Sequence, residues 1–179
     1  MDALTHFFLP LTAAYVIVGE RVPTWFLLPL CGVALLPDLD KFLGAPGLLH
    51  SLLTLAPLAG AIVVLEWRAR RTLVLSTLVL ALLGSHLLLD LLDGGPIPLL
   101  YPVVDGGVGL TYPGRAVFGT GLLGVDVEGP LVALRTATPR QGFNAYGFVT
   151  GFGVVSALLF GTIVAGRRHA PRRREGESA

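Results

Sequence analysis

The chain has 179 residues, of which 53% are hydrophobic and 14% are charged, and its formal net charge is +1. Soluble domains carry about 25% charged residues, so this composition excludes an ordinary soluble domain and indicates an integral membrane protein. The single cysteine, Cys31, excludes an intramolecular disulfide and a cysteine-rich zinc site. We expect membrane lipid as a partner and no nucleic-acid partner, and the sequence leaves the oligomeric state open.

Five apolar segments follow one another along the chain, and each is predicted to form a helix. They cover residues 4–19, 24–37, 50–65, 72–92 and 145–165. The first two are shorter than the roughly 20 residues that a full span requires, so they cross a membrane only with local thinning or cover from neighbours. The predicted fold class is therefore all-α, an integral membrane bundle of about five helices.

The region between the last two segments has a different composition. Residues 93–144 are rich in Gly, Pro and Thr and are predicted to form a long extracytoplasmic loop, which acts as a partly ordered lid. Small residues at a spacing of four in the last segment, such as Gly153, Ala157 and Gly161, predict close packing against another helix. Residues 1–166 are expected to form one membrane-embedded domain, and residues 167–179 a basic disordered tail.

Basic residues are unevenly distributed over the predicted connectors. If all five segments span, nine of the 13 basic residues fall on one side of the membrane. They are Arg21, Arg68, Arg70, Arg71, Arg167, Arg168, Arg172, Arg173 and Arg174. Because basic residues favour the cytoplasmic side, a multi-pass protein of the inner (cytoplasmic) membrane is predicted, with the N-terminus outside and the C-terminus in the cytoplasm.

The fourth apolar segment ends with a histidine and a carboxylate four residues apart. His86 and Asp90 therefore project from one helix face, about one turn from each other. A charged group at the centre of a membrane helix costs about 2.5 to 3.5 kcal/mol on insertion scales, so this pair indicates a functional site. Further polar residues at the ends of other segments fall in the same predicted leaflet. They are His6, Asp38, Asp40 and His50.

Clustered imidazoles and carboxylates suit a divalent transition metal. We expect zinc, with manganese, iron or cobalt as alternatives. Such a site with an open position lowers the pKa of bound water toward about 7 and supplies a hydroxide nucleophile. Asp40 or Asp93 is then the predicted general base, and Asp38 is a ligand or a partner that holds an imidazole.

Each element of this pattern also has a structural interpretation. His86 and Asp90 alone are compatible with a hydrogen-bonded pair between helices. Asp38 and Asp40 alone are compatible with a solvated helix end, and His50 with a cap of the third helix. The metal interpretation depends on all of these residues meeting at one place.

In combination, these residues resemble a known family. The elements in chain order are His6, Pro37-Asp38-Leu39-Asp40, His50-Ser51, Gly84-Ser85-His86-Leu87-Leu88-Leu89-Asp90 and Ile97-Pro98-Leu99-Leu100-Tyr101-Pro102. They resemble the YdjM-like inner-membrane proteins, which are described as predicted metal-dependent hydrolases or LexA-binding membrane-associated hydrolases. The resemblance covers about residues 1–105. It implies that the metal-site positions are His6, Asp38, Asp40, His50, His86 and Asp90. Many members have Thr where this chain has Asp93, which adds a carboxylate.

The sequence thus predicts a membrane-embedded metal-dependent hydrolase whose site opens toward the extracytoplasmic interface. Its expected substrate is a small molecule or a lipid, such as a phosphoester, that enters from the bilayer. The alternative is a non-catalytic membrane protein in which the same cluster holds a structural metal or relays protons or ions.

Overall fold

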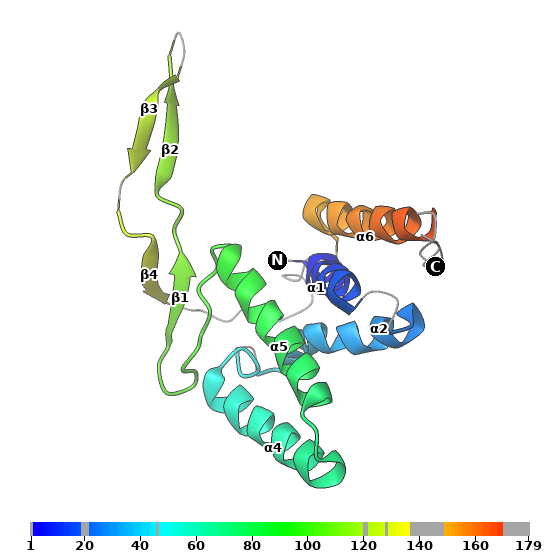
Figure 1. The fold of residues 1–179 in the computed structure, drawn as a ribbon. Helices are drawn as coiled ribbons and strands as arrows, with labels where there is room; N and C mark the ends of the chain where they lie inside the picture. Colours follow the sequence, from blue (N-terminus) through cyan, green and yellow to red (C-terminus); the bar gives the residue numbers. More distant parts are fainter. Residues whose placement is uncertain are drawn as a thin grey trace, which may run out of the picture.

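The computed structural model describes residues 2–18, 22–45, 47–119, 122–127, 129–136 and 149–169. Its helices, shown in Figure 1, come from both ends and the middle of the chain. They are α1 (Ala3–Val18), α2 (Thr24–Cys31), the 3-10 helix η2 (Gly32–Asp38), α3 (Leu39–Phe42), α4 (Leu52–Arg70), α5 (Val74–Leu92) and α6 (Gly151–His169).

The buried core lies where α1, α2, η2 and α5 meet. Its members are Leu11, Tyr15, Leu27, Cys31, Ala34 and Leu82. Helix α6 packs along α1 on the outer side of this core (Figure 1). Helices α1, η2 and α5 pack against one another in this core. As a result, the ring of His6 on α1 stacks on the ring of His86 on α5.

The segment predicted as one helix over 24–37 changes its geometry midway. An α-helix continues to Cys31, and a 3-10 helix then runs over Gly32–Asp38. In a 3-10 helix the carbonyl of residue 34 would accept from the N–H of residue 37, but Pro37 has no N–H. The Ala34 carbonyl accepts instead from His86 Nδ1 at 2.7 Å. The change of helix type therefore frees a backbone acceptor for the histidine of α5.

The prediction of an all-α fold is wrong. Within the predicted loop, strands β1 (Gly106–Leu110), β2 (Gly114–Phe118), β3 (Leu122–Val127) and β4 (Val132–Thr136) form two antiparallel pairs, β1 with β4 and β2 with β3. Figure 1 shows them as a narrow ribbon that extends away from the helices. The strands are rich in glycine, which is depleted in sheets, and β1 pairs with a strand distant in sequence, so neither composition nor local pattern indicated them.

The base of this ribbon is fixed to the end of α5. Ile97 forms a bridge to Val108, and Tyr112 Oη donates to the carbonyl of Leu92. A Cβ at Gly109 would lie 3.3 Å from the Gly94 carbonyl oxygen, so glycine permits the close approach of the two backbones. The ribbon is thus attached within a few residues of Asp90.

The expectation of five spanning helices also needs correction. By length and composition, only α4 and α5 among the described helices are clearly able to cross a membrane. Helix α1 has 16 residues, and the apolar part of α6, Gly151–Arg167, is also shorter than a full span. Helix α1 continues through Pro10, whereas the α-helical part of the second segment ends at Cys31, where the 3-10 helix begins.

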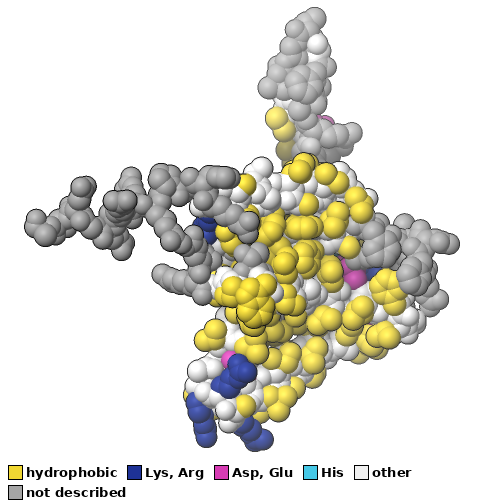
Figure 2. All heavy atoms as spheres, turned by 90° about the vertical axis from the view of Figure 1, so that its right-hand side faces the viewer, with side chains coloured by type: hydrophobic (Ala, Val, Ile, Leu, Met, Phe, Trp, Pro, Cys, Tyr) yellow, Lys and Arg dark blue, Asp and Glu magenta, His cyan; other side chains and the backbone are white. Residues whose placement is uncertain are grey.

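The outer surface nevertheless suits an apolar environment. Trp25, Phe152 and Leu158 are 73%, 73% and 64% exposed. Figure 2 shows a face covered largely by apolar side chains, with Lys and Arg side chains gathered at its lower end. In Figure 1, the turn between α4 and α5 lies at the same height. Exposed apolar area of this extent marks a lipid or protein contact surface.

Candidate metal centre

Three histidines from different elements are held in one orientation. His6 lies on α1, His50 precedes α4, and His86 lies on α5. Each bonds through Nδ1 to an oxygen acceptor: His6 to the Asp2 carbonyl at 3.0 Å, His50 to Asp40 Oδ2 at 2.9 Å, and His86 to the Ala34 carbonyl at 2.7 Å. Because a carbonyl or carboxylate oxygen only accepts, Nδ1 carries the proton in each ring. The three Nε2 atoms are therefore available as ligands.

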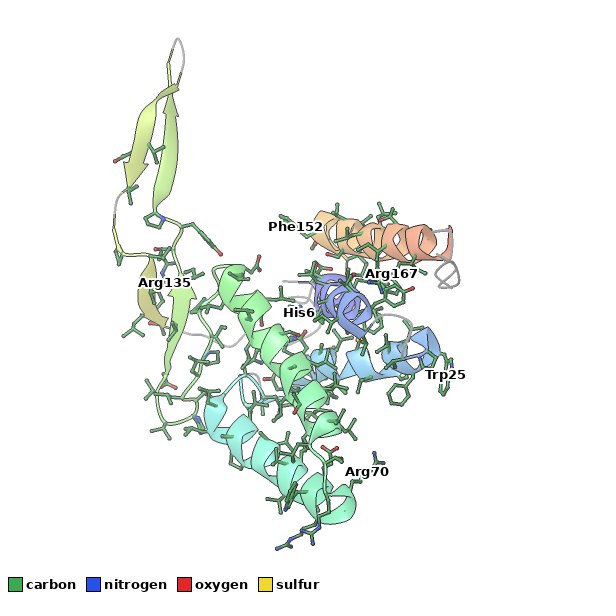
Figure 3. All side chains as sticks on the ribbon, in the orientation of Figure 1. His6, Trp25, Arg70, Arg135, Phe152 and Arg167 are labelled. Carbon is green, nitrogen blue, oxygen red and sulfur yellow. The ribbon has the colours of Figure 1, made fainter. Side chains whose placement is uncertain are left out.

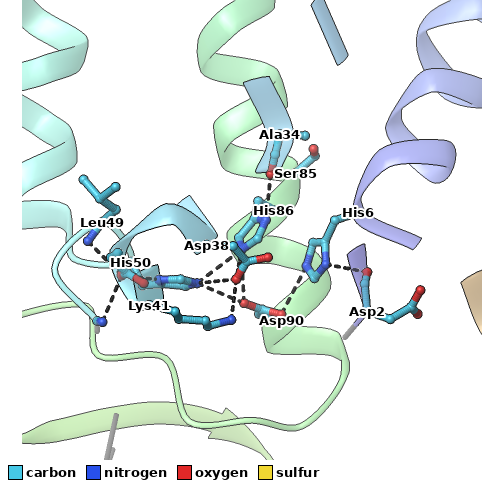
Figure 4. Close-up of polar contacts among 12 residues, drawn as sticks. Asp2, His6, Ala34, Asp38, Lys41, Leu49, His50, Ser85, His86 and Asp90 are labelled. Carbon is cyan, nitrogen blue, oxygen red and sulfur yellow. Dashed lines mark hydrogen bonds and ion pairs between the residues drawn. The ribbon is translucent and has the colours of Figure 1, made fainter. Parts of the chain in front are cut away.

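The Nε2 atoms converge on two carboxylates, as Figure 4 shows. The Nε2 atoms of His50 and His86 are 3.2 Å apart, and both lie 3.4 Å from Asp90 Oδ2. His6 Nε2 lies 3.1 Å from the other oxygen of Asp90. Asp38 Oδ1 is 3.8 Å from His50 Nε2 and 3.7 Å from His86 Nε2. Five side chains thus direct nitrogen or oxygen atoms into one volume.

These distances fit a shared divalent cation. Two donors at 2.0–2.1 Å from a tetrahedral metal lie about 3.4 Å apart, which matches the separations in the cluster. Two ligand groups are defined, His6 with His86 and Asp90, and Asp38 with His50 and His86. Within each group, all the ligand atoms lie within 4.8 Å of one another. His86 belongs to both groups, so its ring joins them.

Two features of the cluster show that its imidazole nitrogens need a further partner, either a proton or a metal ion. With both Nδ1 atoms protonated, the lone pairs of His50 and His86 face each other at 3.2 Å, which is repulsive unless a proton or a metal lies between them. Among the described residues, His6 Nε2 is buried and has no hydrogen bond of good geometry, although Asp90 lies close. The donor set therefore fits a zinc-type ion.

Burial and neighbouring carboxylates have opposite effects on the pKa of His50. Burial lowers its pKa, but hydrogen bonds and charge from Asp40 and Asp90 outweigh that effect and raise the pKa to about 9. In the metal-free protein the His50 ring is therefore protonated at neutral pH, and the proton occupies the lone pair that would bind a metal. A metal ion must displace this proton.

Asp40 lies behind His50. Its Oδ2 accepts from the backbone N–H of Gly47 at 2.9 Å, from that of Leu49 at 3.1 Å and from His50 Nδ1. Asp40 was predicted as a metal ligand and as a general base, but neither ligand group in the described part of the chain includes it. Its contacts are those of a carboxylate that orients a ligating imidazole.

Asp93, the other predicted base, lies at the end of α5. It is exposed, it caps the helix, and its backbone N–H donates to the carbonyl of Leu89 at 2.9 Å. It is one turn beyond Asp90 and is also outside both ligand groups found among the described residues.

The loop after α5 contacts the residues that directly follow His50. Ser51 Oγ donates to the Leu99 carbonyl and accepts from the N–H of Leu53, so it caps α4. The N–H of Leu52 donates to the same Leu99 carbonyl at 2.9 Å. The segment from Ile97 to Pro102, which contributes to the family resemblance, therefore fixes the start of α4.

Sequence reasoning missed the groups that support the cluster. The carbonyls of Asp2 and Ala34 are backbone atoms, and no side-chain pattern indicates them. Lys41 was missed as well, although it directly follows Asp40 and is the only lysine of the chain. Its Nζ donates to Asp38 Oδ1.

Taken together, the fold and the site define a helical protein with membrane-length helices and a buried His/Asp cluster of the kind that binds a divalent metal. The family model described as YdjM inner membrane protein matches residues 1–170, and the chain belongs to this family. The predicted resemblance is confirmed, and the match extends it through the ribbon to α6. The family description places the protein in the inner membrane. Comparisons with curated proteins and with solved structures found no match.

Proposed function

We propose that the protein is a membrane-embedded metal-dependent hydrolase. A divalent transition metal, zinc first, would be held by His6, His50, His86, Asp38 and Asp90. The single observation that carries this proposal is that three imidazoles from three elements each fix Nδ1 on an oxygen acceptor and turn Nε2 toward the same two carboxylates. Metal-ligating histidines characteristically have such a partner on the other ring nitrogen.

When bound, a divalent cation in such a site supplies Lewis-acid chemistry and the activation of water for hydrolysis. Side chains of the protein would orient the ligands and accept the proton. Asp40 positions His50 and keeps its Nδ1 protonated. Asp93 is the candidate general base, because it is exposed and lies one turn beyond Asp90 at the end of α5.

The position of the cluster supports a substrate that reaches it from the membrane surface. His86 and Asp90 lie in the last two turns of α5, next to the attachment of the ribbon. The opposite end of α5 follows the basic Arg68, Arg70 and Arg71. Because a basic turn favours the cytoplasmic side, the cluster would face the extracytoplasmic interface. A lipid-derived or other phosphoester substrate is proposed on this basis.

Elemental analysis of the detergent-purified protein tests the metal site. The wild type is expected to hold a stoichiometric transition metal, and His86→Ala is expected to lose it, since His86 is shared by both ligand groups. His169→Ala, which removes an imidazole at the end of α6, is the matched control and should retain the metal. Metal-free wild-type protein would contradict the proposal.

Asp93→Asn then separates a hydrolase from the alternative. If the variant retains its metal but loses hydrolysis of phosphoester substrates, the protein is an enzyme. If the wild type binds metal, hydrolyses none of these esters and unfolds when the metal is removed, the site is structural. If proton or ion flux across vesicles depends on His86 instead, the cluster is a relay.

A further inference from the structure

Four of the five ligand side chains are enough to surround one metal ion. The Nε2 atoms of His50 and His86 lie 3.2 Å from each other and 3.4 Å from Asp90 Oδ2. They lie 3.8 and 3.7 Å from Asp38 Oδ1. Donors around a tetrahedral zinc ion are about 3.4 Å apart, and four of them complete its shell. One ion can therefore be fully coordinated without His6.

His6 faces the other oxygen of Asp90. Its Nε2 lies 3.1 Å from Asp90 Oδ1, and its ring stacks on that of His86 between α1 and α5 (Figure 3). The His6 side chain is 1% exposed, and its Nε2 makes no hydrogen bond of good geometry within the described part of the chain. Because Nδ1 donates to the Asp2 carbonyl, a lone pair on Nε2 faces a carboxylate oxygen. This contact is repulsive unless a cation, either a proton or a metal ion, lies between the two atoms.

Asp90 can serve two ions, whereas His86 can serve only one. His86 belongs to both ligand groups, but its Nδ1 donates to the Ala34 carbonyl, so the ring has a single lone pair for a metal. The two oxygens of Asp90 face different imidazoles. Oδ2 faces His50 and His86, and Oδ1 faces His6. A carboxylate in this position can bind one ion through each oxygen.

We propose that the cluster holds two divalent ions and that Asp90 bridges them. The other ligands of the first ion are His50, His86 and Asp38, and the second ion is bound by His6. This inference rests on the proposed hydrolase function and deepens it. In two-metal hydrolytic sites the ions are about 3.5–4 Å apart and together stabilise the attacking and leaving oxygens of the substrate.

The second position is the open one. His6 and Asp90 supply only two donors to it, so water or substrate would complete its shell. The Asp90 side chain is 20% exposed, whereas those of His50 and Asp38 are 8% and 4% exposed. The cluster is therefore most accessible at the residue that joins the two positions.

The charges of the cluster predict that the second ion binds more weakly than the first. Three carboxylates, those of Asp38, Asp40 and Asp90, lie against the ligating histidines, and Lys41 Nζ donates to Asp38. One divalent ion together with Lys41 balances these three negative charges. A second ion adds net positive charge, which a hydroxide or an anionic substrate would offset. We therefore expect two ions to bind in sequence.

Electron paramagnetic resonance of the full chain in detergent, titrated with Mn²⁺, counts the bound ions and shows whether they are adjacent. The wild type is expected to bind two equivalents. The first should give the spectrum of an isolated ion. At saturation the spectrum should become that of a spin-coupled pair, because ions bridged by one carboxylate lie close together.

Two variants on different helices remove the second position alone. His6→Phe keeps a ring against His86 but has no nitrogen donor. Asp90→Asn keeps one oxygen donor for the first ion but has no second oxygen for another. Each variant is expected to bind one equivalent, with the spectrum of an isolated ion. The wild-type spectrum tests the pair even if a variant does not fold.

His169→Phe makes the same replacement at the end of α6, so it is the matched control and should still give the coupled pair. One equivalent in the wild type, or two without spin coupling, would overturn the inference and leave a single-ion hydrolase. A coupled pair that persists in both His6→Phe and Asp90→Asn would also overturn it, because the ions would then lie elsewhere. Absence of Mn²⁺ binding in the wild type would instead contradict the proposed function itself.

Discussion

At the scale of single residues, the site depends on the atoms behind the ligands as much as on the ligands. Each of the three imidazoles has its Nδ1 fixed by an oxygen, and two of these oxygens belong to the backbone. The pattern of His and Asp could therefore predict the candidate ligands. It could not predict the orientation of the rings, because that depends on a carbonyl freed by Pro37 and on one at the start of α1.

The role of Asp40 is tested by Asp40→Asn, which keeps the shape of the side chain but removes its charge. We expect metal affinity to fall about 10- to 100-fold, the usual effect of changing a group that orients a ligating histidine. Competition with a chromogenic chelator measures this affinity. Asp105→Asn, at an exposed loop carboxylate, should leave it unchanged. Unchanged affinity in Asp40→Asn would contradict a positioning role.

At the scale of elements, the first and last described helices, α1 and α6, pack against each other. The Asp2 carboxylate accepts from the N–H of Leu4 and from the hydroxyls of Thr5 and Thr150, so it caps α1 and ties it to the start of α6. Desolvation raises the pKa of Asp2, but its bonds to Thr150 and Thr5 outweigh this effect and lower the pKa overall. His6 belongs to the same first turn, so this cap also fixes the position of a proposed ligand.

Gly153 tests the importance of this helix contact. A Cβ at Gly153 would lie 2.2 Å from Asp2 Oδ1 and 2.7 Å from Leu4 Cβ, so Gly153→Ala must displace the start of α1. We expect a loss of about 1–3 kcal/mol, as for other overpacked sites, together with weaker metal binding through His6. Thermal unfolding in detergent and metal titration measure the two effects.

Gly161→Ala is the control on the same helix. A Cβ at Gly161 meets nothing within 4 Å, so this variant should be neutral or slightly stabilised by the better helix propensity of alanine. The glycine spacing in the sequence predicted close helix packing in general. It could not show which glycine makes the contact, because that depends on where α1 runs relative to α6. Equal behaviour of the two variants would contradict a close α1–α6 contact at Gly153.

At the scale of the whole molecule, the sequence predicted that helices form but did not predict the ribbon of β1 to β4. Long apolar runs predicted α1 and α5 to within two residues at each end, because burial or lipid contact selects such runs, whereas α4 continues five residues beyond its predicted end at residue 65. The pairing of β1 with β4 joins segments separated by more than 20 residues, and no local pattern encodes it. The predicted lid stays a prediction. The glycine-rich strands and the attachment to α5 are findings of the structure.

The cluster also connects the whole molecule, because it joins α1, η2, the start of α4 and the end of α5. In the metal-free protein, this connection depends on protonated His50. Its pKa is raised to about 9 from an ordinary value of about 6.5, so its contribution to stability is complete below pH 6.5 and is lost as the pH rises through 9. When a metal ion is bound, the stability instead increases with pH, because the metal binds more tightly as the ring loses its proton.

We therefore expect the melting temperature of chelator-treated protein to fall between about pH 6.5 and 9, and that of protein in a fixed concentration of free Zn²⁺ to rise. A change of 1 kcal/mol corresponds to about 2–4 °C for a chain of this size, so opposite shifts of several degrees are expected. Differential scanning fluorimetry in detergent measures both series. In His50→Gln both slopes should flatten, because the proton and the metal compete for the same nitrogen. Parallel slopes in the two wild-type series would show that the stabilising metal binds elsewhere.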